Sequence, residues 1–143
     1  MKTVANILAA KGSDVFAIAP GASVYDALQL LADKNVGALA VVDDSKLVGI
    51  VSERDYARKV VLVDRSSRET PVSEIMSAKV NTVAPTASLE DCMELMTERH
   101  IRHLPVLDGD ELVGMISIGD VVKAVIADLA AMVEQLDNYI RGG

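Results

Sequence analysis

Two copies of a single sequence unit make up most of the chain, and this duplication limits what the chain can fold into. When the sequence is shifted by 65 residues, residues 15–60 align with residues 80–125 without a gap, and 16 of the 46 aligned pairs are identical. A period this long with only two copies is not typical of a solenoid array. The alignment predicts a duplicated α/β unit that folds against its own twin.

Each copy predicts the same order of elements. A short strand ends near Pro20 or Pro85, and a helix begins at Ser23 or Ser88, where an Asp three residues later suggests a capping box. Strands follow at 38–42 and 47–52, and at 103–107 and 112–117, separated by turns at 43–46 and 108–111. The strands are continuous apolar runs, so we expect both faces of each sheet to be covered.

The helices show apolar residues at helical spacing, and we expect these faces to point into the core. They are Val24, Ala27, Leu28 and Leu31 in the first copy, and Leu89, Cys92, Met93 and Met96 in the second. The polar stretch 64–72 predicts a mobile connection, and 73–77 a short helix. We therefore divide the chain into a first repeat with its N-terminal helix and linker, 1–72, and a second repeat, 73–143.

Composition limits the classes of partner. Half of the 143 residues are hydrophobic, with no Trp and one Phe, so the core must consist mainly of aliphatic side chains and Met. The formal net charge is -7 and the isoelectric point is about 4.7. Because duplex affinity rests largely on Lys and Arg at phosphates, an acidic chain favours neither nucleic acid nor an anionic membrane.

Cysteine and histidine usage argues against disulfides and metal sites. Cys92 is the single cysteine, which excludes an intramolecular disulfide and a cysteine-based zinc site, and we expect its side chain in the core. His100 and His103 are the only histidines and lie outside any H-E-x-x-H motif. We expect no metal.

Targeting signals are also not expected. The N-terminal apolar run meets Lys11 and Asp14 too early for a signal peptide. No apolar stretch approaches the roughly 18 residues of a membrane span. We therefore expect a cytoplasmic protein.

One phrase occurs in both copies, directly after an apolar run. It reads LVGIVSERDY at 47–56 and LVGMISIGDV at 112–121, so a Gly, two apolar residues, a Ser, two free positions and an Asp recur. With the helix-to-strand joins KNVGALAVVD and RHIRHLPVLD, these features resemble a tandem pair of cystathionine-β-synthase (CBS) domains, often called a Bateman module. The resemblance covers roughly residues 4–126 and is specific because two motifs stand in register.

This resemblance implies a fold and a function. The fold is α/β (α+β), with two β-α-β-β-α repeats packed about a pseudo-twofold axis and two clefts between them. Family members commonly bind adenine nucleotides there, including AMP, ADP, ATP, NAD(H) and S-adenosylmethionine, with AMP our first choice. They usually act as sensors rather than catalysts, so we expect a regulatory module that senses cellular energy or redox state and is not an enzyme. The resemblance therefore implies signal transduction, with a regulated protein partner that the chain does not identify.

The phrase itself suits a nucleotide. Ser52 and Ser117 sit where a strand ends and a helix begins, and a helix N-terminus favours an anion such as phosphate. Asp55 and Asp120 are placed to accept the ribose hydroxyls, as an acidic residue does in dinucleotide folds. The alternative is that Ser-x-x-Asp is an ordinary helix cap that needs no ligand. Both interpretations can hold at once.

The residues that we expect to contact a nucleotide come from strand ends, helix starts and helix-to-strand joins of both copies. They are Ile18, Gly37, Ala38, Leu39, Ser52, Arg54, Asp55, Thr82, Val83, Arg102, His103, Leu104, Pro105, Ser117, Gly119 and Asp120. The adenine would lie near the apolar residues of this set. Arg54 could pair with a phosphate or be solvated. Because Gly37-Ala38 corresponds to Arg102-His103, we expect two clefts that differ in ligand or affinity.

A long C-terminal helix is predicted from Asp120 to about Ile140. Apolar residues repeat at spacings of three and four, which is a coiled-coil pattern: Val122, Val125, Leu129, Met132, Leu136 and Tyr139. Ile126, Val133 and Ile140 broaden the stripe. We expect it to pack on another subunit in a homodimer or higher oligomer, the alternative being its own chain.

Two other functions compete with nucleotide sensing. Asp55 and Asp120 occupy matching positions of separate copies, which indicates equivalent binding roles and not an acid–base couple. The sequence also has no P-loop and no Gly-x-Gly-x-x-Gly motif, so we expect no enzyme. The remaining alternative is a structural dimeric adaptor without a nucleotide ligand.

Overall fold

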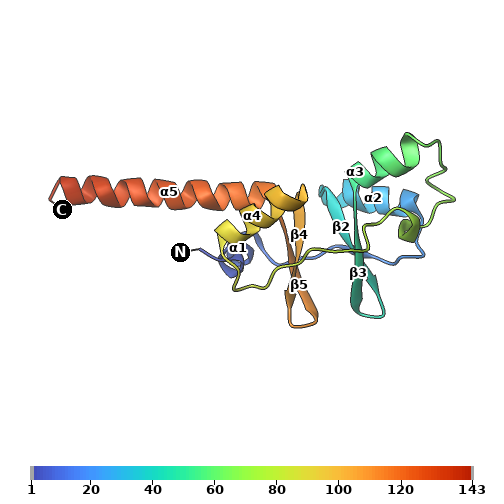
Figure 1. The fold of residues 1–143 in the computed structure, drawn as a ribbon, viewed down its shortest axis with the longest axis horizontal. Coiled ribbons are helices and arrows are strands. Elements are labelled where there is room, and N and C mark those ends of the chain that lie inside the picture. The colour runs from blue at the N-terminus through green and yellow to red at the C-terminus, as the bar shows by residue number, and fades with distance from the viewer. Residues whose placement is uncertain (1, 143) are drawn as a thin grey trace.

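The computed structural model describes residues 2–142 and shows two α+β repeats side by side, with a long helix extending from the second (Figure 1). The first repeat consists of β1 (Ala17–Ile18), α2 (Val24–Lys34), β2 (Ala38–Asp43), β3 (Lys46–Ser52) and α3 (Glu53–Tyr56), which continues as the π-helical turn η1 (Ala57–Val61). The second consists of α4 (Leu89–Arg99), β4 (His103–Asp108), β5 (Glu111–Ser117) and α5 (Ile118–Ile140). Two further segments precede the repeats, α1 (Val4–Lys11) and the short 3-10 helix η2 (Val72–Glu74).

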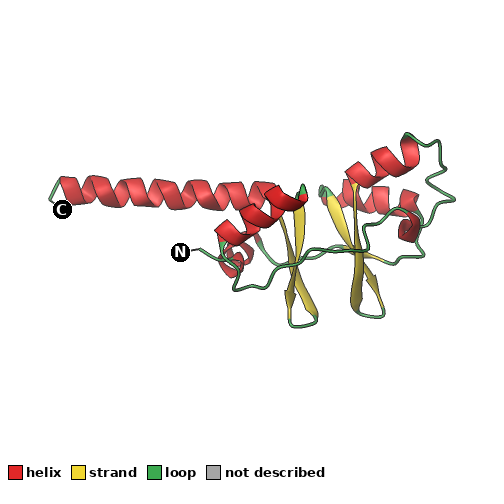
Figure 2. Cartoon of the chain, in the orientation of Figure 1, coloured by secondary structure: helices red, strands yellow, loops and turns green. Residues whose placement is uncertain are grey.

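Each repeat contains an antiparallel hairpin, and the two hairpins lie side by side with their turns at the same edge (Figure 2). In the first repeat β1 adds a parallel strand beside β2. In the second, the predicted strand before Pro85 is reduced to a parallel bridge between Val83 and Val106. The polar Asn81 stands where the first copy has Phe16, which packs on the core, so less apolar surface holds this segment in place.

Serine caps start both predicted helices. Ser23 Oγ accepts the Asp26 N–H at 3.1 Å, and Ser88 Oγ accepts the Asp91 N–H at 3.1 Å. The predicted boxes are only half formed here, because the exposed Asp26 and Asp91 carboxylates do not accept the N–H of their serines in return.

The inward faces of the helices agree with their spacing, with one exception. Val24, Ala27 and Leu31 are buried in α2, and Leu89, Cys92 and Met96 in α4. Met93 was expected in the core but is 44% exposed, and the next apolar residue toward the core face, Leu95, packs there instead.

The segment before each repeat packs on the other repeat. α1 contributes Val4 and Ile7 to the core of the second repeat, although by sequence we grouped it with the first. The segment around η2 contributes Val72 and Ile75 to the core of the first. The arrangement is symmetric, since the Val4 N–H donates to Ala87 O at 2.9 Å and the Val72 N–H donates to Ala22 O at 2.8 Å. The two repeats are therefore held together by exchanged segments.

The linker expected to be mobile is tied to the start of α2. The Val24 N–H donates to Thr70 O and the Tyr25 N–H to Ser67 O, both at 2.9 Å, and Thr70 is 4% exposed. The first amides of a helix lack acceptors within the helix, and the linker supplies them.

The last helix has a packed part and a free part. Val121, Ala124 and Val125 pack on the core of the second repeat, and the rest of α5 extends away from both repeats (Figure 1). Within residues 2–142, no helix combines the length and apolar character needed to cross a membrane.

Candidate functional site

The repeated phrase forms a complete capping box in both copies. In the first, Asp55 Oδ2 accepts the Ser52 N–H at 3.0 Å and its hydroxyl at 3.1 Å, while the Asp55 N–H donates to Ser52 Oγ at 3.2 Å. In the second, Asp120 Oδ2 accepts the Ser117 N–H at 2.8 Å, and the Asp120 N–H donates to Ser117 Oγ at 3.1 Å. The interpretation of Ser-x-x-Asp as a helix cap is thus confirmed, and each box fixes a carboxylate at the start of a helix.

The glycine of the phrase allows another segment to approach the strand. A Cβ built on Gly114 would lie 2.7 Å from Leu8 Cδ2 of α1, and one built on Gly49 would lie 2.5 Å from Met76 Sδ. Both approaching residues belong to the exchanged segments. Glycine, serine and aspartate of the phrase therefore each have a role in the fold itself.

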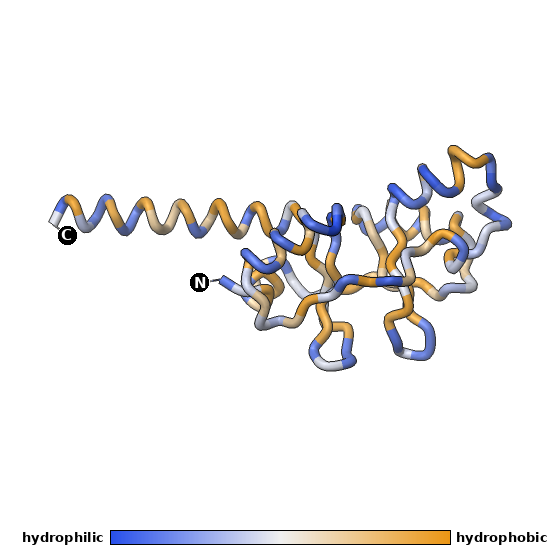
Figure 3. Tube along the Cα trace, in the orientation of Figure 1, coloured by the Kyte–Doolittle hydropathy of each residue, from blue (hydrophilic) through white to orange (hydrophobic). Residues whose placement is uncertain are grey.

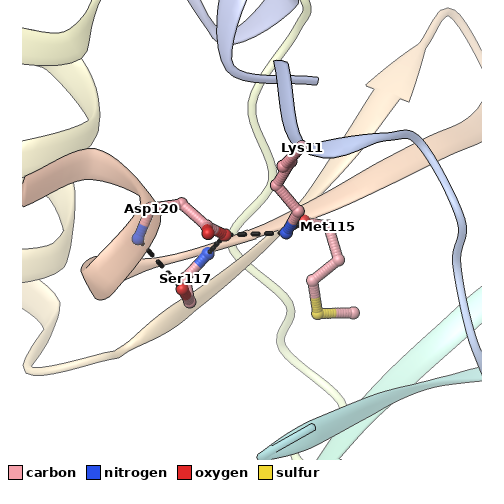
Figure 4. Close-up of polar contacts among 4 residues, drawn as sticks. All are labelled: Lys11, Met115, Ser117 and Asp120. Atoms are coloured by element: carbon pink, nitrogen blue, oxygen red, sulfur yellow. Dashed lines mark hydrogen bonds and ion pairs between the residues drawn. The ribbon is translucent and has the colours of Figure 1, made fainter. Parts of the chain in front are cut away.

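Each carboxylate is also paired with a lysine. Lys59 Nζ lies 3.0 Å from Asp55 Oδ1 and donates to Ile75 O at 2.9 Å. Lys11 Nζ, at the end of α1, donates to Asp120 Oδ2 at 2.7 Å and to Met115 O at 2.8 Å (Figure 4). Neither lysine was among the predicted site residues.

Two clefts contain these carboxylates. The Asp55 cleft has a volume of about 650 Å³ and the Asp120 cleft of about 460 Å³. The Asp55 cleft is lined by Gly37, Ile50, Ser52, Glu53, Arg54, Asp55, Arg58, Lys59, Ser77, His100, Ile101, Arg102 and His103. The Asp120 cleft is lined by Lys11, Gly12, Asp14, Phe16, Asn35, Val36, Gly37, Ala38, His103, Met115, Ser117 and Asp120.

Each cleft combines parts of both repeats. The Asp55 cleft joins the Ser–Asp pair of the first repeat to residues 100–103 of the second, and the Asp120 cleft joins the second pair to residues 35–38 of the first. Gly37 and His103 line both clefts, and a Cβ built on Gly37 would lie 3.3 Å from His103 Nε2. The two clefts are therefore equivalent by the repeat and meet at this contact.

The clefts differ in charge. The lining of the Asp55 cleft includes four basic side chains, Arg54, Arg58, Lys59 and Arg102, and two carboxylates. The lining of the Asp120 cleft includes one basic side chain, Lys11, and two carboxylates. A polyanion therefore fits the Asp55 cleft better than the Asp120 cleft.

Two titratable groups of the Asp120 cleft have shifted pKa values. Partial burial opposes ionisation of Asp120, but hydrogen bonds from Lys11 and Ser117 outweigh it and hold the pKa of this carboxyl below its usual value. Burial lowers the pKa of His103, and Lys11 and Arg102 lower it further. The carboxylates of Asp120 and Glu53 act in the opposite direction without cancelling the effect. The His103 imidazole is therefore neutral at neutral pH.

Nine of the sixteen predicted contact residues line a cleft, and seven lie outside both clefts. Those in a cleft are Gly37, Ala38, Ser52, Arg54, Asp55, Arg102, His103, Ser117 and Asp120. The seven outside are Ile18, Leu39, Thr82, Val83, Leu104, Pro105 and Gly119.

The four apolar residues expected beside an adenine have their side chains in the cores of the repeats. Leu39 and Leu104 are fully buried, and their side chains fill the cores of the first and second repeats. Ile18 and Val83 pack against the same two cores. Residues on these strands point alternately to the two faces of the sheet, and these four side chains point to the face that the helices cover.

Several cleft residues escaped prediction from the sequence. Lys59 lies four residues after Asp55 on the same helical run, and this i,i+4 spacing could have indicated the ion pair between them. Lys11 is 109 residues from Asp120 and comes from an exchanged segment, so no local pattern points to it. Among residues 2–142, no three His, Cys, Asp or Glu side chains gather in a group that could hold a metal ion.

Comparison with known proteins identifies the family. The CBS domain family model matches residues 7–62 and 72–127, and the chain belongs to this family as a tandem pair of CBS domains. CBS domain-containing protein CBSX3, a mitochondrial protein of Arabidopsis thaliana, is 44% identical over 126 residues. That match covers 85% of this chain and 61% of the plant protein, so the chain spans less than two thirds of its relative's length.

Solved structures show the same fold. A protein from Burkholderia ambifaria MC40-6 that is described as a signal-transduction protein with CBS domains is 58% identical to this chain. Its structure superposes with a TM-score of 0.86 over 89% of this chain and 96% of that chain. The CBS domain pair of protein MJ0100, in complex with 5′-methylthioadenosine and S-adenosyl-L-methionine, is 24% identical with a TM-score of 0.78. The match covers 90% of this chain and 98% of the MJ0100 chain. At 24% identity the similarity concerns the fold alone.

Proposed function

We propose that the two clefts bind adenine nucleotides and that their occupancy regulates a protein partner. The observation that carries this proposal is the equivalence of the clefts, each of which presents a fixed carboxylate paired with a lysine. Their volumes, about 650 and 460 Å³, fall within the usual range of small-molecule sites. The adenosine ligands of the MJ0100 domain pair give further support.

The charges of the clefts divide the ligands between them. Arg54, Arg58 and Arg102 suit the phosphates of AMP, ATP or NAD(H) in the Asp55 cleft, because guanidinium groups bind phosphate oxygens in pairs. The Asp120 cleft suits an adenosine ligand with less negative charge, with Lys11 beside it. AMP remains our first choice, since its single phosphate fits either cleft.

Ligand binding would compete with the lysine pairs. Asp55 Oδ2 and Asp120 Oδ2 are occupied by their own serines, so a ribose hydroxyl would bind through free lone pairs or replace Lys59 or Lys11. Replacement of Lys11 would loosen the attachment of α1 to the second repeat. Regulation requires two states of the protein that differ in ligand affinity. The chain with α1 attached and the chain with α1 loosened would be two such states. We assign the chain a regulatory and not a catalytic role, and a cytoplasmic location stays a prediction.

A thermal-shift experiment tests this function. Protein freed of carried-over nucleotide is titrated with AMP, ADP, ATP, NAD, NADH and S-adenosylmethionine, as wild type, Asp55→Asn and Asp120→Asn. A ligand at a hundred times its Kd stabilises by about 2.7 kcal/mol. For a chain of this size the melting temperature rises on the order of 10 °C.

Asp91→Asn is the matched control, because Asp91 occupies the same position of another helix cap but lies outside both clefts. We expect each cleft variant to lose the shift of one ligand and the control to keep both. No shift with any ligand would favour the alternative, a structural adaptor in which Ser-x-x-Asp only caps helices.

A further inference from the structure

The free part of α5 carries a continuous apolar stripe. Its side chains are between 46% and 80% exposed, which is unusual for large aliphatic residues in a row. They are Val122, Ile126, Leu129, Val133, Leu136 and Ile140. Figure 3 shows the alternation of apolar and polar residues along the extended helix.

The packing of Val125 selects the register of this stripe. The spacings within it are four and three in turn, so Ile126, Val133 and Ile140 take position a of a heptad and Val122, Leu129 and Leu136 take position d. The seam predicted from the sequence used Val125, Met132 and Tyr139 at the alternate positions and placed Ile126, Val133 and Ile140 beside them. Val125, however, packs on the core of its own repeat. The a and d positions of the new register face away from that core.

The residues that attach α5 to its own chain lie on another face. Val121, Ala124 and Val125 pack in the second core, and Asp128 lies 3.6 Å from Lys2 Nζ beside α1. The body of the chain therefore leaves the stripe uncovered. A second copy of α5 offers the complementary stripe.

We propose that α5 pairs with α5 of a second copy as an antiparallel coiled coil centred near Ala131. In this arrangement Ile126 packs against the partner subunit's Leu136, and Leu129 against the partner subunit's Val133. The paired stripe runs over 122–140, about 28 Å of helix. The repeats of the two copies then lie at opposite ends of the pair, which matches the projection of α5 away from the body (Figure 1).

Charges beside the stripe favour the antiparallel orientation. Position e carries Lys123, Ala130 and Asp137, and antiparallel pairing places Lys123 beside the partner subunit's Asp137, twice per dimer. In a parallel pair, Asp137 would instead lie beside the apolar Met132 of the partner, and Lys123 would have no acidic neighbour. Within one chain Asp137 is held 3.2 Å from Arg141 Nε, and both side chains are exposed.

Cysteine cross-linking tests the orientation. The variants are Ile126→Cys, Leu136→Cys and the double variant, with Cys92 kept in place because it is buried. The two introduced cysteines lie about 15 Å apart on one helix, too far for a disulfide within the chain. Mild oxidation should link the double variant into a covalent dimer and leave both single variants unlinked. A self-linked dimer of either single variant would indicate parallel pairing and overturn the proposal.

A charge exchange gives an independent measurement of the same pairing. Lys123→Glu and Asp137→Lys should each weaken the dimer on the order of three- to tenfold by sedimentation, and the double exchange should recover most of the loss. Arg141 is present in every variant, so the comparison of Asp137→Lys with the double exchange isolates the contact between subunits. Wild-type protein that sediments as a monomer, or a double exchange that is no tighter than either single variant, would overturn the proposal.

Discussion

Lys11 Nζ lies 2.7 Å from Asp120 Oδ2, and this ion pair joins the end of the first helix to the start of the last one. The corresponding carboxylate of the first repeat, Asp55, takes its lysine from the next turn of its own helical run. The two clefts therefore use equivalent carboxylates, and each carboxylate is linked to an exchanged segment. Asp120 is linked to α1 directly through Lys11, whereas Asp55 is linked to the segment around η2 through Lys59, which also donates to Ile75 O at 2.9 Å.

Replacing Lys11 should reduce stability in a pH-dependent way. Because the pKa of Asp120 is lowered in the folded state, its ionised form adds stability above its unfolded-state pKa of about 3.9. This contribution is lost as the pH falls through the folded-state value. We expect Lys11→Met to lower the free energy of unfolding at pH 7 by up to about 1 kcal/mol, since both groups are partly exposed.

Urea unfolding of both proteins at pH 7 and near pH 3 checks this prediction, and the difference between them should shrink at the lower pH. Lys2→Met is the control, since Lys2 forms a longer pair with Asp128 outside the clefts. An equal loss at both pH values would mean that packing and not the ion pair carries the effect.

A side chain on the glycine of the phrase should destabilise the fold. A Cβ on Gly114 would lie 2.7 Å from Leu8 Cδ2, so Gly114→Ala forces the Leu8 side chain of α1 away from β5. We expect a loss of about 1–3 kcal/mol, measured by denaturant unfolding. Gly21→Ala is the control, because a Cβ there meets no atom within 4 Å.

A second substitution makes this prediction specific. Leu8→Ala removes the obstructing methyl groups, so it should cost less in the Gly114→Ala background than in wild type. Additive losses from the two substitutions would contradict the close-contact explanation.

The local elements of the fold could be predicted from the sequence, because their signals are local. Apolar runs and turn residues located the strands, and the serine caps located the helices at Val24 and Leu89. Met93 shows the limit of this approach, since spacing alone does not distinguish a residue at the centre of an apolar helix face from one at its exposed edge.

The exchange of segments between repeats could not be predicted in the same way. Val4 is 85 residues from its core partner Leu89, and nothing in the sequence near it indicates which repeat it completes. For the same reason the set of site residues predicted from the sequence did not include Lys11. The positions of Ser52, Asp55, Ser117 and Asp120 were accessible because the repeat marks them twice.

The pKa of His103 should respond to both neighbouring charges of the Asp120 cleft. Burial holds it below its usual value, Asp120 raises it and Lys11 lowers it. We therefore expect Asp120→Asn to lower the pKa further and Lys11→Met to raise it, as followed by NMR titration of the imidazole signals. His100→Gln identifies which of the two histidine signals belongs to His103. Identical titration curves in all three proteins would contradict the close placement of these groups.

Arg102 should discriminate among ligands by their phosphate charge, if the proposed nucleotide site is correct. Arg102 lines the Asp55 cleft with Arg54 and Arg58, so Arg102→Ala should weaken ATP more than AMP, and AMP more than adenosine. Calorimetric titration of the three ligands measures the differences. Arg99→Ala is the control, because Arg99 ends α4 outside both clefts. Equal losses for all three ligands would place the phosphates elsewhere.

Removing residues 129–143 should lower the oligomeric state and leave the two repeats folded. The shortened chain keeps Val121, Ala124 and Val125, which attach α5 to the second core, and loses most of the exposed stripe. Light scattering measures the mass, and circular dichroism with thermal unfolding reports on the repeats. A chain ending after Ile140 serves as the control and should keep the wild-type mass. An unchanged mass in the shorter chain would show that the copies associate through the repeats themselves, since the clefts and both cores remain while the stripe is gone.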